Sequence, residues 1–492
     1  MKEQNRIANV VNSKFYPLLL FYVSFVFVTL FSRSTSFLYV FEGADPSVFK
    51  QMGRAILKGK IMYVDYFDNK GCLLYFIHAL GLWLGGNTAL LIMQAISLTV
   101  TLLIWDKMLE LFRSPRQRLT SLIVALFLLF CFYGAGDQTQ EWCLPFISYP
   151  LLVFLRAHHS KTEIRPLQML AIGVCSGIIT FIQINNACAF LGFIAYLWFQ
   201  FLAKKEFKKL FQSIGCFMTG WLTIAVPCVL YFYIQAGWHG IYEMVYASFL
   251  SNFEYIAIQH QRQWYYWLPY SVFIASIIGI QIVNYRNEKR LMTPILISIS
   301  LFVLTFGRLC NSFYLASLLP LFIINMATID FSKSKAKNRI LPSVALLFAF
   351  FIGIMSFFHF INDLILRNEK EVVIYKDFHK CIENIPTEER DSIHNYNLFW
   401  HGYSMMQNED LLQCNRVSIA YDLPTLMKQE SSKQLAPPKW IMMSPNMRYY
   451  DEDAKFILNN YELVDSLHYD RLYFHHPRIG NELEILFFRR KD

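Results

Sequence analysis

Long apolar stretches without a charged side chain constrain this sequence more than any other feature. A helix needs about 17–25 residues to cross the ~30 Å hydrocarbon core of a bilayer, and charged side chains are costly there. Eleven apolar stretches, several of them short, contain no Asp, Glu, Lys or Arg, and we expect each to be a span. They are residues 16–31, 87–105, 119–133, 142–155, 167–181, 187–203, 210–234, 267–283, 291–306, 313–329 and 341–361. The sequence therefore predicts an all-α polytopic membrane protein with about 11 transmembrane helices.

The charged residues divide the chain into two regions. Residues 1–362 carry 29 Lys and Arg but 15 Asp and Glu, whereas residues 363–492 carry 16 and 21. The second region has a soluble composition and is long enough for one small domain. In it, KWIMM and LEILFF are typical of strands and DEDAKFILNNY of a helix. We expect a transmembrane module over 1–362 and an α/β domain over 363–492. The net charge of +9 is the sum of these two regions and does not indicate nucleic acid.

The basic residues predict the orientation, because cytoplasmic loops carry an excess of Lys and Arg. If the N-terminus is cytoplasmic and the apolar segment 71–86 does not cross, 21 of the 29 basic residues in 1–362 lie on the cytoplasmic side. A crossing by 71–86 would reverse every later basic loop. We therefore expect 71–86 to lie along or dip into the outer interface of a plasma (inner) membrane, with the C-terminal domain outside. Cys381 and Cys414 share that domain, and their pairing is left open.

The first exterior loop, residues 32–86, is too long to be a simple connection. Its segment FEGADPSVFKQMGRAILKG predicts an amphipathic helix, because Asp45 and Pro46 favour a helix start and Gly59 favours its end. Lys50, Arg54 and Lys58 fall opposite the apolar face, so we expect them to face lipid phosphates. The loop continues with YVDYFDNKG, a turn-rich stretch that carries Asp65, Asp68 and Lys70.

The other exterior loops also supply polar groups. Residues 134–141 contain Asp137 and Glu141. Residues 235–266 contain an amphipathic stretch followed by QHQRQWYYWLP, with Arg262. The short loop GRLCN contributes Arg308. We therefore expect these acidic and basic side chains to lie at the same membrane surface.

In these motifs the sequence resembles the membrane glycosyltransferases called GT-C, the superfamily of protein O-mannosyltransferases (glycosyltransferase family 39-type) and lipid A aminoarabinose transferases. The resemblance rests on four features in order. They are an acid before an amphipathic helix (EGADPSVFKQMGRAILKG), a tyrosine-rich turn ending in Lys (YVDYFDNKG), a Gln/His/Arg segment before WYYWLP, and a Gly-Arg pair before FYLASLLP. An exterior C-terminal domain follows them.

The resemblance implies a sugar transfer from a polyprenyl-phosphate donor to a hydroxyl, with inversion. It implies that Asp45 is the base and that Lys70 and Arg262 hold the phosphate. The chain departs from its relatives at two places. Gln183, Asn185 and Asn186 follow the fifth span, where relatives often have a basic residue. Ser312, Phe313 and Tyr314 stand where some relatives have His-Tyr.

The residues lead to the same chemistry by themselves. Nucleotide sugars are cytoplasmic, so an enzyme whose polar loops lie outside needs a lipid-linked donor. Displacing its phosphate requires a carboxylate to take the acceptor proton, worth roughly 10²–10⁴ in rate, and cations around the leaving group. We assign the base to Asp45 and the phosphate contacts to Lys70, Arg262 and Arg308. Glu141, and less directly Asp137, would orient the acceptor or act as a second acid. Further candidates for the sugar or acceptor pocket are Tyr63, Tyr66, Asp68 and Tyr314.

Several alternatives stay open. Asp45 is also interpretable as a helix cap, the cations as headgroup anchors, and Asp65 and Asp68 as turn formers. At the level of function the alternatives are a lipid-linked glycan polymerase or ligase, a flippase or transporter of lipid-linked sugars, and a non-catalytic receptor or assembly factor. The expected partners are a polyprenyl-phosphate sugar, a hydroxyl acceptor on a glycan, lipid or protein, and the bilayer. No cofactor is indicated, and a divalent metal is left open.

Overall fold

A computed structural model describes most of the chain. The described residues are 9–35, 37–133, 136–258, 264–306, 312–328, 354, 358, 361, 368–396, 399–412, 414, 438–444, 451–470 and 482–491. They group into two compact units. One comprises residues 1–32, 91–231 and 259–359, and the other residues 33–90, 232–258 and 360–492. The second unit thus collects segments that the sequence predicts to lie outside the membrane.

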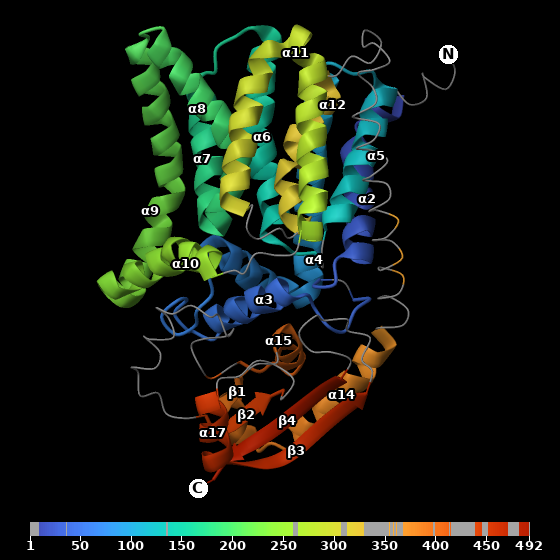
Figure 1. Ribbon diagram of the computed structural model, residues 1–492, viewed down its shortest axis with the longest axis vertical. Coiled ribbons are helices and arrows are strands. Elements are labelled where there is room, and N and C mark those ends of the chain that lie inside the picture. The colour runs from blue at the N-terminus through green and yellow to red at the C-terminus, as the bar shows by residue number, and fades with distance from the viewer. Residues whose placement is uncertain are drawn as a thin grey trace. The chain divides into compact units, whose positions relative to one another are not determined.

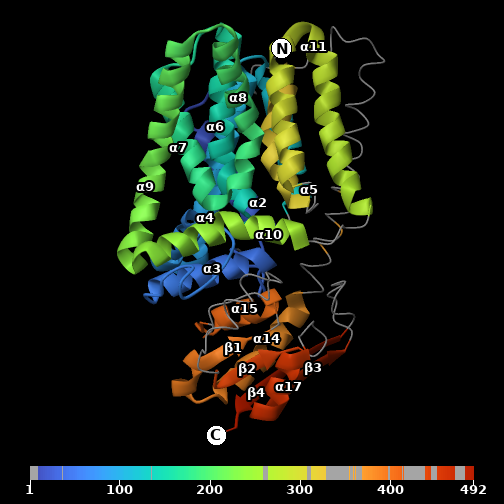
Figure 2. The same cartoon turned by 60° about the vertical axis from the view of Figure 1, so that its left-hand side comes forward.

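The first unit is built from apolar helices. Figure 1 shows α6, α7 and α8 running side by side in it, and Figure 2 shows the same from another direction. Its described helical elements are α2 (Tyr16–Phe31), the part of α4 (Cys72–Glu110) from residue 91 on, α5 (Pro115–Phe132), α6 (Thr139–Ser160), α7 (Pro166–Gln183), η1 (Ile184–Ala187), α8 (Cys188–Ala203), the part of α9 (Phe207–Val245) up to residue 231, α11 (Trp264–Phe306), η3 (Ser312–Leu318) and α12 (Leu319–Thr328).

Ten of the eleven predicted spans coincide with these helices. The eleventh, 341–361, lies outside the described residues except for three isolated positions. Judged by length and composition of the described residues, four helical stretches are long and apolar enough to cross a membrane. They are Cys72–Glu110, Pro115–Phe132, Pro166–Ala203 and Phe207–Glu254. The chain is therefore a helical membrane protein, and the number of about 11 crossings stays a prediction.

Glycine allows α7 and α9 to pack at backbone contact. A Cβ atom on Gly173 would lie 2.0 Å from the carbonyl oxygen of Phe217, and one on Gly220 would lie 2.0 Å from that of Leu170. Neither position has space for a side chain. Small residues at helix interfaces give close van der Waals packing, which stabilises helix association in a membrane.

Two long helices break where the sequence predicts a span to meet an exterior segment. In α4 the break falls at Gly85 and Gly86, and in α9 at Ala236 and Gly237. Residues 72–84 therefore form a helix of their own, about 20 Å long at 1.5 Å per residue, which is too short to cross a ~30 Å core. This supports the prediction that 71–86 does not cross.

The second unit contains α3 (Ala44–Leu57), the helix 72–84, and a helix that follows the break at Gly237. The latter passes through a π-helical turn, η2 (Tyr246–Leu250), into α10 (Ser251–Ile258). We call residues 238–258 the post-break helix. The C-terminal part adds α14 (Asn368–Glu383), η6 (Thr387–Ser392), β1 (Ile393–Asn395), α15 (Phe399–Asn408), β2 (Trp440–Met443), α17 (Asp451–Asn460), β3 (Tyr461–Asp470) and β4 (Glu482–Arg490).

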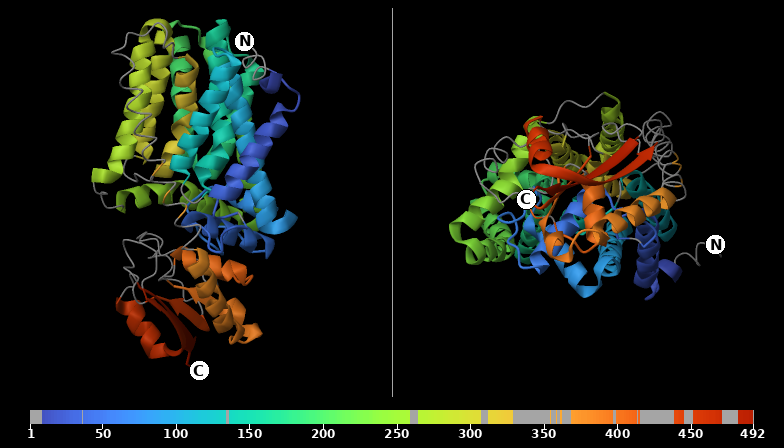
Figure 3. Two further views of the ribbon diagram at one scale, coloured as in Figure 1. Left: turned by 90° about the vertical axis from the view of Figure 1, so that its right-hand side faces the viewer. Right: turned by 90° about the horizontal axis from the view of Figure 1, so that it is seen from below.

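The four strands form one mixed sheet in the order β1-β2-β4-β3. β1 pairs with β2 in parallel, with Ile393 opposite Trp440, and the other two pairs are antiparallel. Helices cover both faces (Figure 3). Met442 and Phe487 point into a core with α14 and α15, whereas alternate strand residues pack with α17. The predicted strands and helix of this region are confirmed as β2, β4 and α17.

Candidate functional site

Asp45 lies in the first turn of α3, which begins at Ala44 with Gly43 as its cap residue. The prediction that Asp45 starts the helix as its cap is therefore wrong by two positions. The carbonyl of Gly43 accepts the Ser47 N–H at 3.2 Å, so the backbone closes this turn. A negative charge in a first turn is favoured by the helix dipole. The half-buried carboxylate of Asp45 thus belongs to a regular helix end.

On the basic side of α3, Lys50 and Arg54 have protein partners, whereas they were predicted to face lipid phosphates. Lys50 is only 1% exposed, and its ammonium group contacts the Glu42 carboxylate, the Ser34 carbonyl and, at 2.9 Å, Asn87 Oδ1. Arg54 Nε lies 3.3 Å from Asp410 Oδ1 in the C-terminal region. A buried lysine needs a charged partner, and Glu42 supplies it. These basic residues hold the second unit together.

The loop after α3 is fixed by Tyr63 and Asp65. Asp65 Oδ2 accepts the Ile61 N–H at 2.7 Å, so Asp65 forms a turn, one of the roles that the sequence left open. Tyr63 is buried and has a φ of +66°, in the left-handed region that a side chain rarely adopts. Its N–H bonds the Tyr66 carbonyl at 2.6 Å, and its hydroxyl donates to the Lys70 carbonyl at 2.6 Å. Such a strained backbone persists only when several contacts hold it.

Tyr75 brings Asp68 and Lys70 together. Its hydroxyl donates to Asp68 Oδ2 at 2.6 Å and accepts the Lys70 N–H at 3.1 Å. Asp68 is buried, and Lys70 Nζ donates to Asn69 Oδ1 at 2.7 Å. The sequence analysis missed Tyr75, since it looks like one more aromatic residue in an apolar run. Its position five residues after Lys70, at the start of helix 72–84, was the available signal.

Asp45 interacts electrostatically with both of these charged residues. Burial raises the pKa of the Asp45 carboxyl above its usual value, Lys70 lowers this pKa and Asp68 raises it. The structure thus brings Asp45, Lys70 and Asp68 together, three residues that the sequence singled out. We call them the Asp45 cluster. A carboxyl group with a raised pKa that interacts electrostatically with an ammonium group is an arrangement suited to general acid or base chemistry next to an anion.

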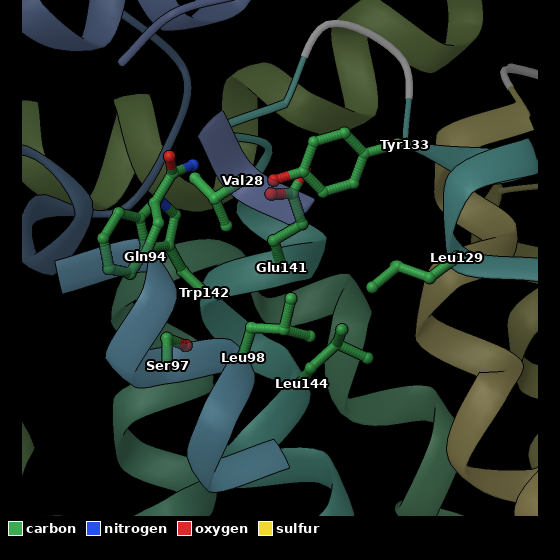
Figure 4. Close-up of a pocket in the computed structure, with 9 residues that line it drawn as sticks. All are labelled: Val28, Gln94, Ser97, Leu98, Leu129, Tyr133, Glu141, Trp142 and Leu144. Carbon is green, nitrogen blue, oxygen red and sulfur yellow. The ribbon is translucent and has the colours of Figure 1, made fainter. Parts of the chain in front are cut away.

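Asp137 and Glu141 lie in the other unit and have structural contacts. The Glu141 carboxylate accepts the backbone N–H groups of Asp137 at 3.2 Å and of Gln138 at 3.3 Å, in the turn that starts α6. Asp137 Oδ1 accepts the Trp142 indole N–H at 2.8 Å. Figure 4 shows the Tyr133 hydroxyl beside the Glu141 carboxylate, at a small pocket. The cavity is lined by Val28, Gln94, Ser97, Leu98, Leu129, Tyr133, Glu141, Trp142 and Leu144.

The remaining candidates are distributed as follows. Tyr66 is buried next to Tyr63 in the loop after α3. Tyr314, in η3, is buried and stacks on Phe306 with ring centroids 4.5 Å apart. Arg262 and Arg308 lie outside the described residues.

The neutral segment after α7 forms a buried polar network. Gln183 Oε1 accepts hydrogen bonds from the Thr139 hydroxyl and, at 3.2 Å, from Gln140 Nε2. Asn186 Oδ1 accepts from the Ser317 hydroxyl at 2.8 Å. These residues thus join α6, the end of α7, η1 and η3 through hydrogen bonds rather than charges.

Two questions that the sequence left open concern cysteines and metal ions. Cys381 and Cys414 do not form a disulfide, and Cys381 is buried in the core beneath the sheet. Within the described ranges, no group of three or more His, Cys, Asp and Glu side chains is arranged to hold a metal ion.

Comparison with protein-family models shows which family the chain belongs to. Residues 3–343 match the family described as competence-induced protein Ccs4 N-terminal domain, which is more than half of the 492 residues. The chain belongs to this family. A comparison with curated proteins gives no match.

Solved structures show the fold of this Ccs4 family member. Crystalline ArnT from Cupriavidus metallidurans bound to undecaprenyl phosphate has a TM-score of 0.61 at 11% identity, over 96% of this chain and 98% of that chain. The apo oligosaccharyltransferase from Archaeoglobus fulgidus has a TM-score of 0.53 at 10% identity, over 88% and 70%. The oligosaccharyltransferase AglB from the same organism, in complex with an inhibitory peptide and a dolichol-phosphate, has a TM-score of 0.50 at 11% identity. The match covers 88% of this chain and 70% of that chain. The chain has the GT-C fold that the sequence predicted.

Proposed function

We propose that this protein is an integral-membrane glycosyltransferase. It moves a sugar from a polyprenyl-phosphate donor to a hydroxyl acceptor on the extracytoplasmic face, with inversion at the anomeric carbon. The observation that carries the proposal is the Asp45 cluster, in which a carboxyl group with a raised pKa lies near the ammonium group of Lys70. Two of the similar structures hold a polyprenyl phosphate, which is the donor class proposed here.

The reaction that we propose needs one base and one anion site. The acceptor oxygen attacks the anomeric carbon while the bond from that carbon to the phosphate oxygen breaks. The phosphate leaves with the bonding electron pair, and Lys70 stabilises the charge that it gains. The acceptor proton passes to the Asp45 carboxylate. Arg262 and Arg308 keep their proposed role as further phosphate contacts, and Glu141 and Asp137 keep theirs at the acceptor.

A second candidate function has its own support. Both Archaeoglobus structures are oligosaccharyltransferases, so transfer of a whole glycan from a lipid carrier also fits the fold. The two functions use the same cluster but give products of different mass. A single-sugar transferase adds one residue, whereas a ligase or polymerase adds a complete oligosaccharide.

The test compares surface glycans by mass spectrometry. Cells lacking the protein are complemented with wild type, with Asp45→Asn or with Asp391→Asn, an exposed carboxylate in the C-terminal region. We expect a glycan that disappears without the protein, returns with wild type and Asp391→Asn, and stays absent with Asp45→Asn at equal membrane abundance. The mass difference then separates one sugar from an oligosaccharide.

The outcomes against the proposal are equally definite. A normal glycan with Asp45→Asn would remove Asp45 as the base. Glycans identical with and without the protein would overturn the proposal. Loss of the glycan together with accumulation of a lipid-linked sugar on the cytoplasmic leaflet would favour the flippase alternative, since a flippase moves the donor across the membrane and breaks no bond.

A further inference from the structure

The post-break helix contacts the loop of the Asp45 cluster through two polar side chains. Ser248 is buried in η2, and its hydroxyl donates to the Tyr63 hydroxyl at 3.3 Å. The Tyr63 hydroxyl donates in turn to the Lys70 carbonyl at 2.6 Å. A hydrogen-bonded chain therefore leads from this helix to the backbone of the residue that we assign to the phosphate.

Asn252, one turn further along, makes the second contact. Its Nδ2 donates at 3.0 Å to the carbonyl of Asn69 and at 3.0 Å to that of Ser248. Asn69 is the residue whose side chain accepts the Lys70 ammonium group at 2.7 Å. Asn252 therefore fixes the residue that orients the Lys70 side chain.

Aromatic rings reinforce the contact between helix and loop. The ring of Tyr246 lies 6.0 Å from that of Phe67, and Tyr63 lies 5.4 Å from Phe232. The π-helical turn lies here, with the Ser251 N–H bonded to the Tyr246 carbonyl five residues earlier. Single π-helical turns inside α-helices occur often at functional sites, where they change which side chains share a face.

The same helix also carries exposed apolar side chains. Trp238 is 76% exposed, Tyr242 52% and Phe253 72%, and they follow at helical spacing. The residues that contact the loop, Ser248 among them, lie on the buried side.

We propose that Ser248 and Asn252 are positioning residues for Lys70. They hold residues 68–70 from the post-break helix, so that the Lys70 ammonium group meets the phosphate of the donor rather than its apolar chain. The inference rests on the proposed function, because it takes Lys70 as a phosphate contact. The inference adds that the site's selectivity for phosphate depends on Ser248 and Asn252. Both are uncharged and lie more than 170 positions after Lys70 in the chain.

The experiment measures selectivity for the phosphate. Purified full-length protein in nanodiscs binds undecaprenyl phosphate or undecaprenol, which has the same chain but no phosphate, and native mass spectrometry gives both affinities. Wild type is compared with Lys70→Ala, Asn252→Asp, Ser248→Ala and Ser251→Ala. Asn252→Asp keeps the shape but replaces the donating amide. Ser251 is the matched control, since its hydroxyl bonds the Ala247 carbonyl of its own helix at 2.7 Å.

We expect Asn252→Asp and Ser248→Ala to lower the affinity for undecaprenyl phosphate by roughly three- to tenfold, the effect of losing one net hydrogen bond. Their affinity for undecaprenol, and both affinities of Ser251→Ala, should match wild type. Equal losses for both lipids would mean that the two residues serve folding only, and would overturn the inference. An effect of Lys70→Ala without an effect of Asn252→Asp and Ser248→Ala would overturn it while leaving the proposed function intact. No effect of Lys70→Ala would overturn the phosphate assignment itself.

Discussion

Arg33 Nη2 lies 2.6 Å from Glu371 Oε1, although 338 residues separate the two in the chain. Arg33 begins the first exterior segment, and Glu371 lies in α14 of the C-terminal part, where its side chain is 0% exposed. Further contacts join the first exterior segment to the C-terminal part. The Ser404 hydroxyl accepts the Glu42 N–H at 3.1 Å, and Phe41 packs in the core of the C-terminal sheet. The C-terminal region is thus a scaffold for the segment that leads to Asp45.

Glu371→Ala tests this relationship. Removing one partner of a buried ion pair costs about 3–5 kcal/mol, because the other charge stays buried without compensation. We expect a large decrease in the Tm of the purified protein, together with loss of glycan transfer. Lys380→Ala is the control in the same helix, since Lys380 pairs with Asp377 at the surface and such pairs contribute about 0–1 kcal/mol. Equal Tm values for the two variants would contradict the scaffold.

The pH dependence of transfer follows from the neighbours of Asp45. A base must be ionised, so activity falls as the pH drops through the raised pKa of Asp45. Lys70→Ala removes the charge that lowers this pKa, so the acid limb of kcat/KM should move to higher pH. Asp68→Asn removes the charge that raises it, so the limb should move to lower pH. Shifts in the same direction would mean that a different group limits activity in acid.

Asp45→Asn has an expected effect on stability as well. The pKa of Asp45 is higher in the folded protein than its ordinary value, so the folded state binds this proton more tightly than the unfolded state does. Ionised Asp45 therefore destabilises the fold at pH values above its folded pKa. At pH 7 the Tm of Asp45→Asn should equal or exceed that of wild type. The difference should shrink as the pH falls below this raised pKa and vanish only below the ordinary pKa of an aspartate in the unfolded chain. A lower Tm for Asp45→Asn at pH 7 would show that the carboxylate stabilises the fold.

Gly53 brings α3 against the helix 72–84. A Cβ atom at this position would lie 2.8 Å from the backbone nitrogen of Ala79 and 3.0 Å from the carbonyl carbon of His78. Gly53→Ala must therefore push the two helices apart, which separates Asp45 from the residues near Lys70. We expect transfer to fall by an order of magnitude or more, roughly the cost of a 1 Å misplacement. Gly215→Ala is the control, because a Cβ atom there meets nothing within 4 Å.

Part of this structure could be predicted from the sequence because the signals are local. Charge-free stretches predict helices, since a membrane excludes charge, and both helix breaks contain the glycine that a sharp turn needs. Asp45, Asp68 and Lys70 could be selected because carboxylate side chains and a lysine occur in the same exterior loop. Only the clustering itself required the fold.

The misjudged features depend on contacts that form only when the chain folds. Lys50 shares the polar side of α3 with Arg54, yet a carboxylate eight residues earlier makes its burial favourable. Nothing near Lys50 indicates this, because Glu42 precedes the helix. Tyr75 and Asn252 were missed for the same reason: an aromatic residue in an apolar run and an amide in an amphipathic helix have no pattern of their own. Their contacts with residues 68–70 exist only once the chain is folded.

The orientation is a prediction that a labelling experiment can test. The positive-inside rule places residue 380 outside and residue 161 in the cytoplasm. Lys380 and Lys161 are both exposed, so a cysteine at either position is accessible to a reagent on its side of the membrane. A membrane-impermeant maleimide should label Lys380→Cys in intact cells above the wild-type background, and Lys161→Cys only after permeabilisation. The reverse pattern would place the C-terminal region, and with it the Asp45 cluster, in the cytoplasm, where a nucleotide sugar rather than a lipid-linked one would be the available donor.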